Sequence, residues 1–219
     1  MNRTRTKLCG MMNAADARAA ADAGADAIGM ILHADARRRI DLDTAAEIVT
    51  ALPPYVTPVG VFVNAPTHLV LEIATKLRLV TVQFHGHETA EDIAAVSPLK
   101  VIKAVRVAPE TIRASLEKLL AQATTNLAAL LLETDTAGVS GGSGVENDFG
   151  LIAQLIAEQA LVGLPPVIIS GGLTPQNVAE VVRLLHPYAV DVSSGIEAEY
   201  GKKSADKMRA FVTNAGASS

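Results

Sequence analysis

The chain has 219 residues, a length that suits one large domain or two small ones. Apolar residues make up 49% of it, enough for a packed core, which excludes disorder as the main state. Nineteen basic and 23 acidic side chains give a net charge of −4, so no nucleic-acid partner is expected. No apolar run approaches the roughly 20 residues of a membrane-spanning helix, so no membrane partner is expected either. The single cysteine, Cys9, excludes an internal disulfide and fits a reducing compartment, and we expect a cytoplasmic location.

Short apolar segments alternate with longer amphipathic segments along the chain. The short segments predict eight buried parallel strands, at residues 6–9, 27–32, 58–63, 79–84, 101–105, 129–132, 167–170 and 189–192. The longer segments predict helices at residues 14–23, 44–52, 68–76, 90–96, 109–120, 148–159, 175–185 and 205–213. Asn13 and either Asp41 or Asp43 are suited to cap the first two helices, and Pro175 to open the seventh.

Eight strand–helix units without a dividing linker predict an α/β protein, a single-domain (β/α)8 TIM barrel over residues 1–219. A short flexible C-terminal tail is expected from Ala215 onward. An open, doubly wound sheet is the alternative that the pattern alone allows. In a barrel, the reactive side chains lie where strands end and the following loops begin. This rule selects the candidate site residues.

Three loops rich in glycine and serine follow the sixth, seventh and eighth strands. Glycine allows the backbone to come close to a ligand, so that successive N–H groups can point at one anion. In any single loop these glycines could serve only a tight turn. Two of the loops follow strands seven and eight, however, where barrels of this kind usually bind phosphate, and the sequence therefore predicts a phosphorylated ligand. The candidate phosphate-binding residues are Gly142, Ser143, Gly171, Gly172, Ser193, Ser194 and Gly195.

Cys9 ends the first predicted strand, and strand alternation turns it to the same side as Lys7. A free cysteine is often only a small buried apolar residue. At the mouth of a barrel, however, a nearby ammonium lowers the pKa of a thiol from about 8.5 and favours the reactive thiolate. Lys7 itself needs a partner, and Asp191 on the adjoining eighth strand is expected to supply it.

The second loop carries Arg37, Arg38 and Arg39. Such a run is often a solvated basic patch. A guanidinium group also binds a carboxylate through two parallel hydrogen bonds, so one of these arginines is expected to hold a substrate carboxylate. His85 follows the fourth strand without a second histidine or a carboxylate at ligand spacing, and no metal site is predicted.

Several motifs follow one another in order, from about Lys7 to Lys203. They include Lys7-Leu8-Cys9-Gly10, Gly60-Val61-Phe62-Val63-Asn64, Val82-Gln83-Phe84-His85-Gly86, Ser170-Gly171-Gly172-Leu173 and Asp191-Val192-Ser193-Ser194-Gly195-Ile196-Glu197. Together they resemble the phosphoribosylanthranilate isomerases of tryptophan biosynthesis. The resemblance implies the barrel fold, no cofactor, and a small phosphosugar–anthranilate substrate that undergoes an Amadori rearrangement. A catalytically silent phosphosugar-binding barrel and another phosphosugar isomerase or epimerase are the alternatives. The sequence leaves monomer and homodimer open.

The same resemblance implies roles for individual residues. Cys9 matches the general base of the family, and Arg38 matches its carboxylate-binding arginine. The family's general acid is an aspartate that closes the sixth strand, but this chain has Glu133 there and Asp135 two residues later. Both are candidate acids, and Glu133 is favoured because it directly follows the apolar strand at the family's distance from the glycine-rich loop. The expected substrate-binding residues are Lys7, Arg38, His85 and Asp191.

Overall fold

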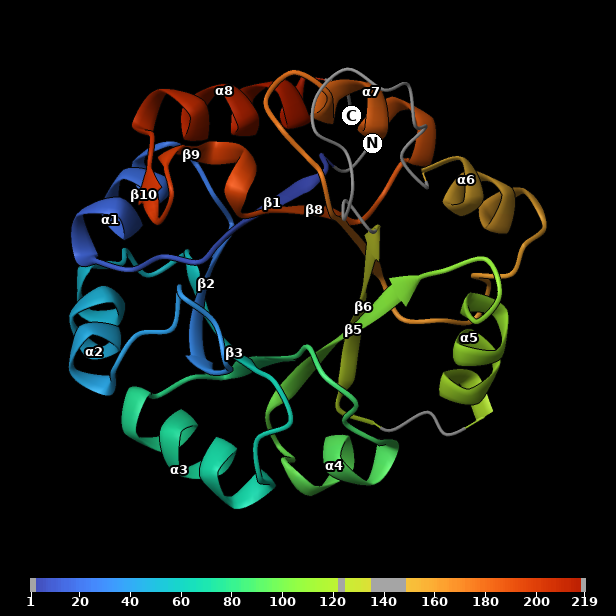
Figure 1. Ribbon diagram of the computed structural model, residues 1–219, viewed down its shortest axis with the longest axis horizontal. Helices are drawn as coiled ribbons and strands as arrows, with labels where there is room; N and C mark the ends of the chain where they lie inside the picture. The colour runs from blue at the N-terminus through green and yellow to red at the C-terminus, as the bar shows by residue number, and fades with distance from the viewer. Residues whose placement is uncertain (1–2, 122–124, 135–148, 218–219) are drawn as a thin grey trace.

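The computed structural model describes residues 3–121, 125–134 and 149–217. Within them, eight strands close into a parallel barrel in chain order, and the helices form a ring around it (Figure 1). The strands are β1 (Arg5–Cys9), β2 (Ala27–His33), β3 (Thr57–Phe62), β4 (Thr81–Phe84), β5 (Lys100–Val107), β6 (Leu127–Thr134), β7 (Val167–Ser170) and β8 (Ala189–Val192). The helices are α1 (Ala14–Asp22), α2 (Leu42–Ala51), α3 (Thr67–Leu77), α4 (Ala90–Ala95), α5 (Ile112–Ala121), α6 (Phe149–Ala157), α7 (Val178–Leu185) and α8 (Ala205–Gly216).

The single-domain (β/α)8 barrel predicted from the sequence is confirmed, with each predicted strand and helix found near its expected place. The strand pairing decides between the barrel and the open sheet, because β1 pairs in parallel with β2 and also with β8, which closes the sheet in chain order. An open sheet, whether doubly wound or not, has two edge strands that pair on one side only, whereas each of these eight strands pairs with two neighbours, so that alternative is wrong. None of the described helices has the length and apolar character that crossing a membrane requires.

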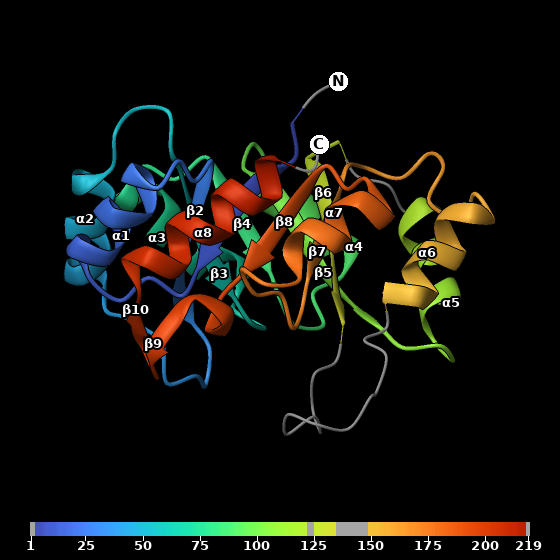
Figure 2. The same ribbon diagram turned by 90° about the horizontal axis from the view of Figure 1, so that it is seen from above.

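The connection from β8 to α8 holds structure that the sequence did not predict. It contains a short 3-10 turn, η1 (Ser194–Ile196), and a hairpin of two very short strands, β9 (Glu197–Glu199) and β10 (Lys202–Lys203). Figure 2 shows the hairpin projecting from the barrel beside α1 and α8. Its strands are short and charged, so they lack the apolar pattern by which a strand is recognised. The last helix, α8, continues to Gly216 and buries Ala215, the residue at which a tail was expected to begin.

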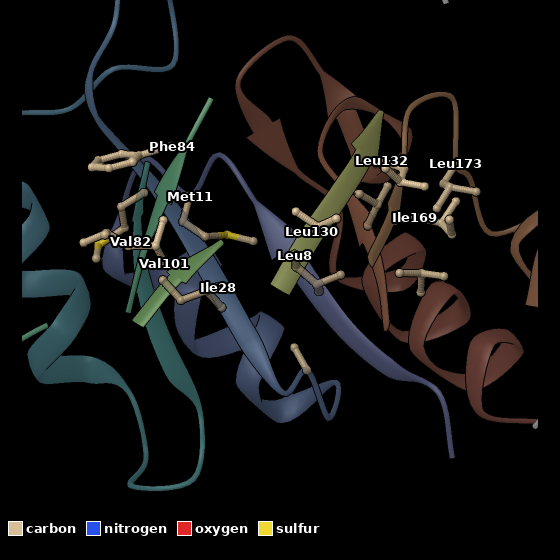
Figure 3. Close-up of a cluster of buried hydrophobic side chains, with 14 of the residues drawn as sticks. Leu8, Met11, Ile28, Val82, Phe84, Val101, Leu130, Leu132, Ile169 and Leu173 are labelled. Carbon is tan, nitrogen blue, oxygen red and sulfur yellow. The ribbon is translucent and has the colours of Figure 1, made fainter. Parts of the chain in front are cut away.

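The core lies mainly between the strands and the surrounding helices. Figure 3 shows part of it, with Leu8, Ile28 and Val82 among its fully buried side chains. Neighbouring residues on one strand belong to different clusters of the core. Leu130 packs in this outer layer, whereas Leu131 belongs to a separate small cluster with residues of β3, β5, β7 and β8. Because successive strand side chains point to opposite faces, the smaller cluster fills the inside of the barrel. The barrel is thus a packed scaffold that holds the strand ends fixed.

Two expected helix caps are found at the first two helices. The side chain of Asn13 accepts a hydrogen bond from the Asp16 backbone N–H at 2.7 Å. Asp41, rather than Asp43, accepts one from the Thr44 backbone N–H at 2.8 Å. Each cap satisfies a backbone donor that the first helical turn leaves without a partner. These caps fix where α1 and α2 begin, and therefore the lengths of the loops that precede them.

The start predicted for the seventh helix is wrong, because α7 begins at Val178 and not at Pro175. The side chain of Asn177 accepts from the Thr174 backbone N–H at 2.8 Å and donates to the Gly172 carbonyl at 2.9 Å. These two bonds hold residues 174–177 as a turn against the loop after β7. The glycine loop is thereby anchored to the start of the following helix.

Candidate active site

In the described part of the chain, the carboxyl ends of the strands border two cavities. The larger, of about 640 Å³, is lined by the loops after β3 and β4, by β5 and α5, and by Glu133 at the end of β6. The smaller, of about 120 Å³, lies among the loops after β7 and β8 and is lined by Glu133 and Asp191. Glu133 therefore lies where the two cavities meet. Because reactive groups of this fold cluster at this end, the two cavities define the candidate site.

The predicted pair of Lys7 and Asp191 is confirmed. The two residues stand opposite each other in the β1–β8 register, and the Lys7 Nζ lies 2.7 Å from the Asp191 Oδ1. Ser170, which closes β7, donates to the other carboxylate oxygen at 3.0 Å. Only 4% and 7% of the Lys7 and Asp191 side chains are exposed, so the pair is nearly dry. Ser170 was not among the predicted site residues, although it ends β7, and the β7–β8 register places it next to Asp191.

Cys9 lies two residues after Lys7 on β1 and is 8% exposed. A β-carbon on Gly29 of the neighbouring strand would lie 2.5 Å from the Cys9 Sγ, so glycine is what leaves room for the thiol. Burial raises the pKa of the Cys9 thiol, and the charge of Asp191 adds to that effect. Lys7 and Lys203 oppose it, as expected for an ammonium next to a thiol, but the net pKa is raised. The resting side chain is therefore a thiol whose conversion to the thiolate depends on its cationic neighbours.

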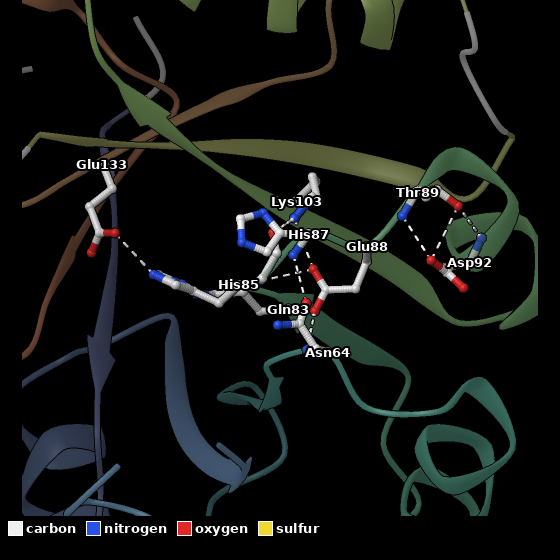
Figure 4. Close-up of polar contacts among 10 residues, drawn as sticks. Asn64, Gln83, His85, His87, Glu88, Thr89, Asp92, Lys103 and Glu133 are labelled. Atoms are coloured by element: carbon white, nitrogen blue, oxygen red, sulfur yellow. Dashed lines mark hydrogen bonds and ion pairs between the residues drawn. The ribbon is translucent and has the colours of Figure 1, made fainter. Parts of the chain in front are cut away.

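Glu133 and His85 approach each other from β6 and from the loop after β4. The His85 Nε2 lies 3.0 Å from the Glu133 Oε2, and the His85 Nδ1 lies 2.7 Å from the Gln83 Nε2 (Figure 4). The exposed fractions of the Glu133 and His85 side chains are 41% and 29%. Gln83 is buried, and its Oε1 has no hydrogen-bond partner among the described residues. The carboxyl of Glu133 is thus drawn toward β4 and stays open to the cavities.

The other candidate acid, Asp135, lies outside the described residues. The same holds for Gly142 and Ser143, two of the expected phosphate-binding residues. The structure therefore places five of the seven expected phosphate-binding residues.

A second ion pair supports the floor of the larger cavity. The Lys103 Nζ lies 2.9 Å from the Glu88 Oε2 and donates to the Gly86 carbonyl at 2.6 Å (Figure 4). The other oxygen of Glu88 accepts from the Asn64 backbone N–H at 2.7 Å. Burial would raise the pKa of Glu88, but Lys103 and the backbone N–H groups outweigh it and lower that pKa. The cluster joins β5 to the loops after β3 and β4, and the described residues include no group of three side chains suited to hold a metal ion.

The loops after β7 and β8 meet at the smaller cavity. Gly171 and Gly172 have φ of +92° and +63°, a conformation that side chains other than glycine rarely adopt. Gly195 faces the other loop, and a β-carbon there would overlap the Leu173 carbonyl. Glycine at these positions allows the two loops to approach each other and to line the cavity with backbone. Ser193 and Ser194 line the same cavity.

Of the three consecutive arginines, only Arg38 is partly buried, whereas Arg37 and Arg39 are exposed. Arg38 donates from Nε and Nη2 to the two carboxylate oxygens of Glu197, at 2.7 and 2.8 Å. The sequence did not indicate this partner, nor the buried Lys203 that contacts the same carboxylate. Glu197 does close the last motif of the family resemblance, which was the one available signal.

A family model described as N-(5′phosphoribosyl)anthranilate (PRA) isomerase matches residues 6–214. The chain is 43% identical over 214 residues to an N-(5′-phosphoribosyl)anthranilate isomerase of Pseudomonas aeruginosa, covering 97% of this chain and 95% of the relative. It is 41% identical over 218 residues to the isomerase of that name from Herminiimonas arsenicoxydans, covering 97% and 92%.

The chain is also similar to solved structures of phosphoribosyl anthranilate isomerases. The phosphoribosyl anthranilate isomerase of Thermotoga maritima superposes with a TM-score of 0.83 at 37% identity, covering 97% of this chain and 98% of that one. A phosphoribosyl anthranilate isomerase in complex with reduced 1-(o-carboxyphenylamino)-1-deoxyribulose 5-phosphate has a TM-score of 0.80 at 35% identity, with the same coverage. A further structure, of monomers generated from the dimeric Thermotoga maritima enzyme, has a TM-score of 0.80 at 34% identity, again with that coverage.

Proposed function

The chain belongs to the N-(5′-phosphoribosyl)anthranilate isomerase family, and from this premise we propose that Cys9 and Glu133 carry out its proton transfers. The protein is an isomerase of tryptophan biosynthesis, which converts N-(5-phosphoribosyl)anthranilate to 1-(2-carboxyphenylamino)-1-deoxyribulose 5-phosphate. The reaction moves protons and redistributes electrons within one molecule. It therefore needs an acid and a base at fixed positions.

The reaction proceeds in three balanced steps. A carboxylic acid gives its proton to the furanose ring oxygen, the C1′–O bond breaks, and the anilino nitrogen lone pair forms the C=N bond of a protonated Schiff base. A base then removes the proton from C2′, and its electron pair neutralises the iminium group to give an enolamine. Proton transfer from the C2′ hydroxyl and to C1′ then gives the 2-ketone. No external oxidant or reductant takes part.

We assign the base role to Cys9. The observation that carries this assignment is the position of its thiol, at the mouth of the barrel beside the buried Lys7–Asp191 pair. Burial would lower the pKa of Lys7, but Asp191 and Cys9 outweigh it and raise that pKa, so Lys7 stays protonated next to the thiol. A fixed cation at this point favours the thiolate over the thiol, which is the form that accepts a proton.

We assign the acid role to Glu133. Its carboxyl is accessible from both cavities, so it can lie beside a sugar whose phosphate occupies the smaller one. Glutamate is one methylene longer than the aspartate of the family, and misplacement of a catalytic group by about 1 Å can cost about 10²-fold in rate. The contact with His85 draws the longer Glu133 side chain toward β4. This orientation supports the proposal that Glu133 takes the role of the family's aspartate.

We propose that backbone N–H groups of the loops at Gly171, Gly172 and Ser193–Gly195 hold the phosphate, and that Arg38 binds the anthranilate carboxylate. Calorimetric titration tests the first part. The product, 1-(2-carboxyphenylamino)-1-deoxyribulose 5-phosphate, should bind, and its unphosphorylated form should bind far more weakly. Equal affinities would contradict the phosphate site.

The experiment that tests the function as a whole is growth rescue of a tryptophan auxotroph that lacks only this isomerase. We expect rescue by the wild-type chain and none by Cys9→Ala at equal expression. A catalytically silent binding barrel predicts no rescue by either, although both would be folded.

We propose a small-molecule substrate as the main partner, a cytoplasmic location from the single unpaired cysteine, and a monomer or homodimer. The dimeric Thermotoga maritima relative supports the homodimer. Light scattering of the purified chain distinguishes the two states.

A further inference from the structure

Three charged side chains from distant parts of the chain meet beside the loop that follows β8. Arg38 comes from the loop after β2, Glu197 from β9 and Lys203 from β10. Arg38 binds both oxygens of Glu197, at 2.7 and 2.8 Å. Lys203 donates to one of the same oxygens at 3.2 Å and to the Ser193 carbonyl at 2.9 Å. We call these three residues the Arg38 cluster.

The Arg38 cluster is largely removed from water. The exposed fractions of its side chains are 20% for Arg38, 7% for Glu197 and 0% for Lys203. Burial would raise the pKa of Glu197, but Arg38 and Lys203 outweigh it and lower the pKa to about 2. Glu197 is therefore ionised at neutral pH. With two cations and one anion, the cluster carries one uncompensated positive charge in a poorly solvated place.

One edge of the Arg38 guanidinium is left open by this arrangement. Glu197 takes the edge formed by Nε and Nη2, and the Tyr200 ring centre lies 4.4 Å from the Arg38 Cζ. No residue of the described chain is hydrogen-bonded to Nη1. The guanidinium is thus held on one edge and against one face, while the end that carries Nη1 is available to a ligand. A planar group fixed in this way loses little conformational freedom when a carboxylate binds.

The cluster borders the catalytic side of the barrel. A β-carbon on Gly10, the residue after Cys9, would lie 3.0 Å from the Arg38 Cδ, 3.0 Å from the Ser193 Oγ and 3.5 Å from the Lys203 Nζ. Gly10 therefore touches both the Arg38 cluster and the loop proposed for phosphate. A ligand that reaches from that loop past Cys9 would meet the open end of Arg38.

We infer that Glu197 is a positioning residue that makes this isomerase selective for substrates with an aryl carboxylate, by holding Arg38 with one edge turned toward the site. The inference rests on the carboxylate-binding role proposed for Arg38. Lys203 keeps the cluster net positive, so that the charge of Glu197 does not cancel the attraction for the ligand. The single charge of the cluster matches the single charge of a benzoate-type carboxylate.

The inference can be tested because a competing role for Glu197, in which it occupies Arg38 in place of the ligand, predicts the opposite result. If Glu197 merely competed with the ligand for Arg38, its removal would free the guanidinium and strengthen binding of a carboxylate. If Glu197 positions Arg38, its removal releases the side chain, leaves two cations facing each other, and weakens binding of the carboxylate. The two roles predict changes of opposite sign.

The experiment compares two ligands by calorimetric titration. One is the product, 1-(2-carboxyphenylamino)-1-deoxyribulose 5-phosphate, and the other is 1-(phenylamino)-1-deoxyribulose 5-phosphate, which lacks only the carboxylate. The ratio of their affinities reports the carboxylate contact, because the phosphate and sugar are common to both. A hydrogen-bonded charge pair predicts a ratio of about 10 to 100 in the wild type.

In Glu197→Gln this ratio should fall about tenfold, through weaker binding of the carboxylated ligand alone, and in turnover KM should rise with kcat little changed. Glu199→Gln is the matched control, because Glu199 lies on the same hairpin and, among the described residues, forms an ion pair with the exposed Lys202 alone. It should keep the wild-type ratio. In an Arg38→Lys background, Glu197→Gln should have no further effect on the ratio, since the group that Glu197 positions is absent.

An unchanged or larger ratio in folded Glu197→Gln would overturn the inference. If that variant does not fold, Glu197→Asp decides by the same criterion, because it keeps the charge but is too short to hold both bonds to Arg38 and the contact with Lys203. A wild-type ratio near one would instead overturn the role proposed for Arg38 in carboxylate binding, and with it the selectivity of Glu197. Arg38→Lys with an unchanged ratio would have the same meaning.

Discussion

Cys9 at the end of β1 is 8% exposed, whereas Glu133 at the end of β6 keeps 41% of its side chain exposed. The proposed base therefore lies in a dry setting, where burial raises the pKa of the thiol and fixed cations oppose that effect. The proposed acid lies at the edge of two cavities and is open to solvent. This contrast indicates that the base depends on exact packing and charge, and the acid on reach and orientation.

Removal of the buried base should have the largest effect. Cys9→Ala should lower kcat by about 10² to 10⁴, the usual worth of a general acid–base group, and leave the fold intact because the side chain is small. Cys9→Ser should keep only a trace of activity, since a hydroxyl is a far poorer base than a thiolate. Steady-state kinetics and thermal unfolding check both variants. Near-native turnover in Cys9→Ala would mean that another group is the base.

Removal of the open acid should come next. Glu133→Gln keeps the shape of the side chain and loses the acid proton, so we expect kcat to fall by about 10² or more. Asp135→Asn, measured alongside, should lose much less. A large loss confined to Asp135→Asn would transfer the acid role to Asp135, and modest losses in both would mean that neither is the principal acid.

A change of packing beside Cys9 should show whether the proposed base, unlike the more open Glu133, depends on close packing. Gly29→Ala adds a β-carbon 2.5 Å from the Cys9 Sγ and must displace the thiol. A shift of about 1 Å would lower kcat by up to about 10²-fold. Gly150→Ala is the matched control, because its added β-carbon meets nothing within 4 Å. Wild-type kcat in folded Gly29→Ala would show that the base does not depend on this close packing.

The smallest expected effect concerns the pH dependence of the stability of the fold, to which the largely buried Glu197 contributes. The folded pKa of Glu197 is lowered from 4.5 to about 2, so its ion pairs with Arg38 and Lys203 stabilise the fold fully above about pH 4.5. This contribution is lost as the pH falls through the folded pKa. Glu197→Gln should be less stable than the wild type at neutral pH, with a difference that shrinks in acid. Urea unfolding measures the difference, and a constant value down to about pH 2 would contradict the assignment.

The sequence predicted the barrel well because its evidence is local and repeated. Eight apolar runs, each followed by an amphipathic segment, leave few other folds, and the adjacency of the first and eighth strands correctly paired Lys7 with Asp191. Pro175 led to the wrong start for the seventh helix because proline suits a loop turn as well as the first turn of a helix. The contacts of Asn177 with the loop after β7 favour the loop turn.

The Arg38 cluster could not be predicted from local patterns. Its members are separated by up to 165 positions in the sequence, and only the folded hairpin after β8 brings Glu197 and Lys203 to Arg38. The net direction of the pKa shift of Cys9 could not be predicted from local patterns either. The sequence indicates that Lys7 is near, but the extent of burial, which outweighs the ammonium, depends on packing around the whole strand end.

The most direct test of the division between Cys9 and Glu133 is the dependence of kcat/KM on pH in the wild type, Glu133→Gln and Cys9→Ala. On the proposed assignment the wild type needs a thiolate and a protonated carboxyl together, so its rate should pass through a maximum. The residual rate of Glu133→Gln needs only the thiolate and should rise with pH until the thiol is fully ionised. The residual rate of Cys9→Ala needs only the acid and should fall as the pH rises. A maximum that persists unchanged in Glu133→Gln would contradict the assignment of Glu133 as the acid.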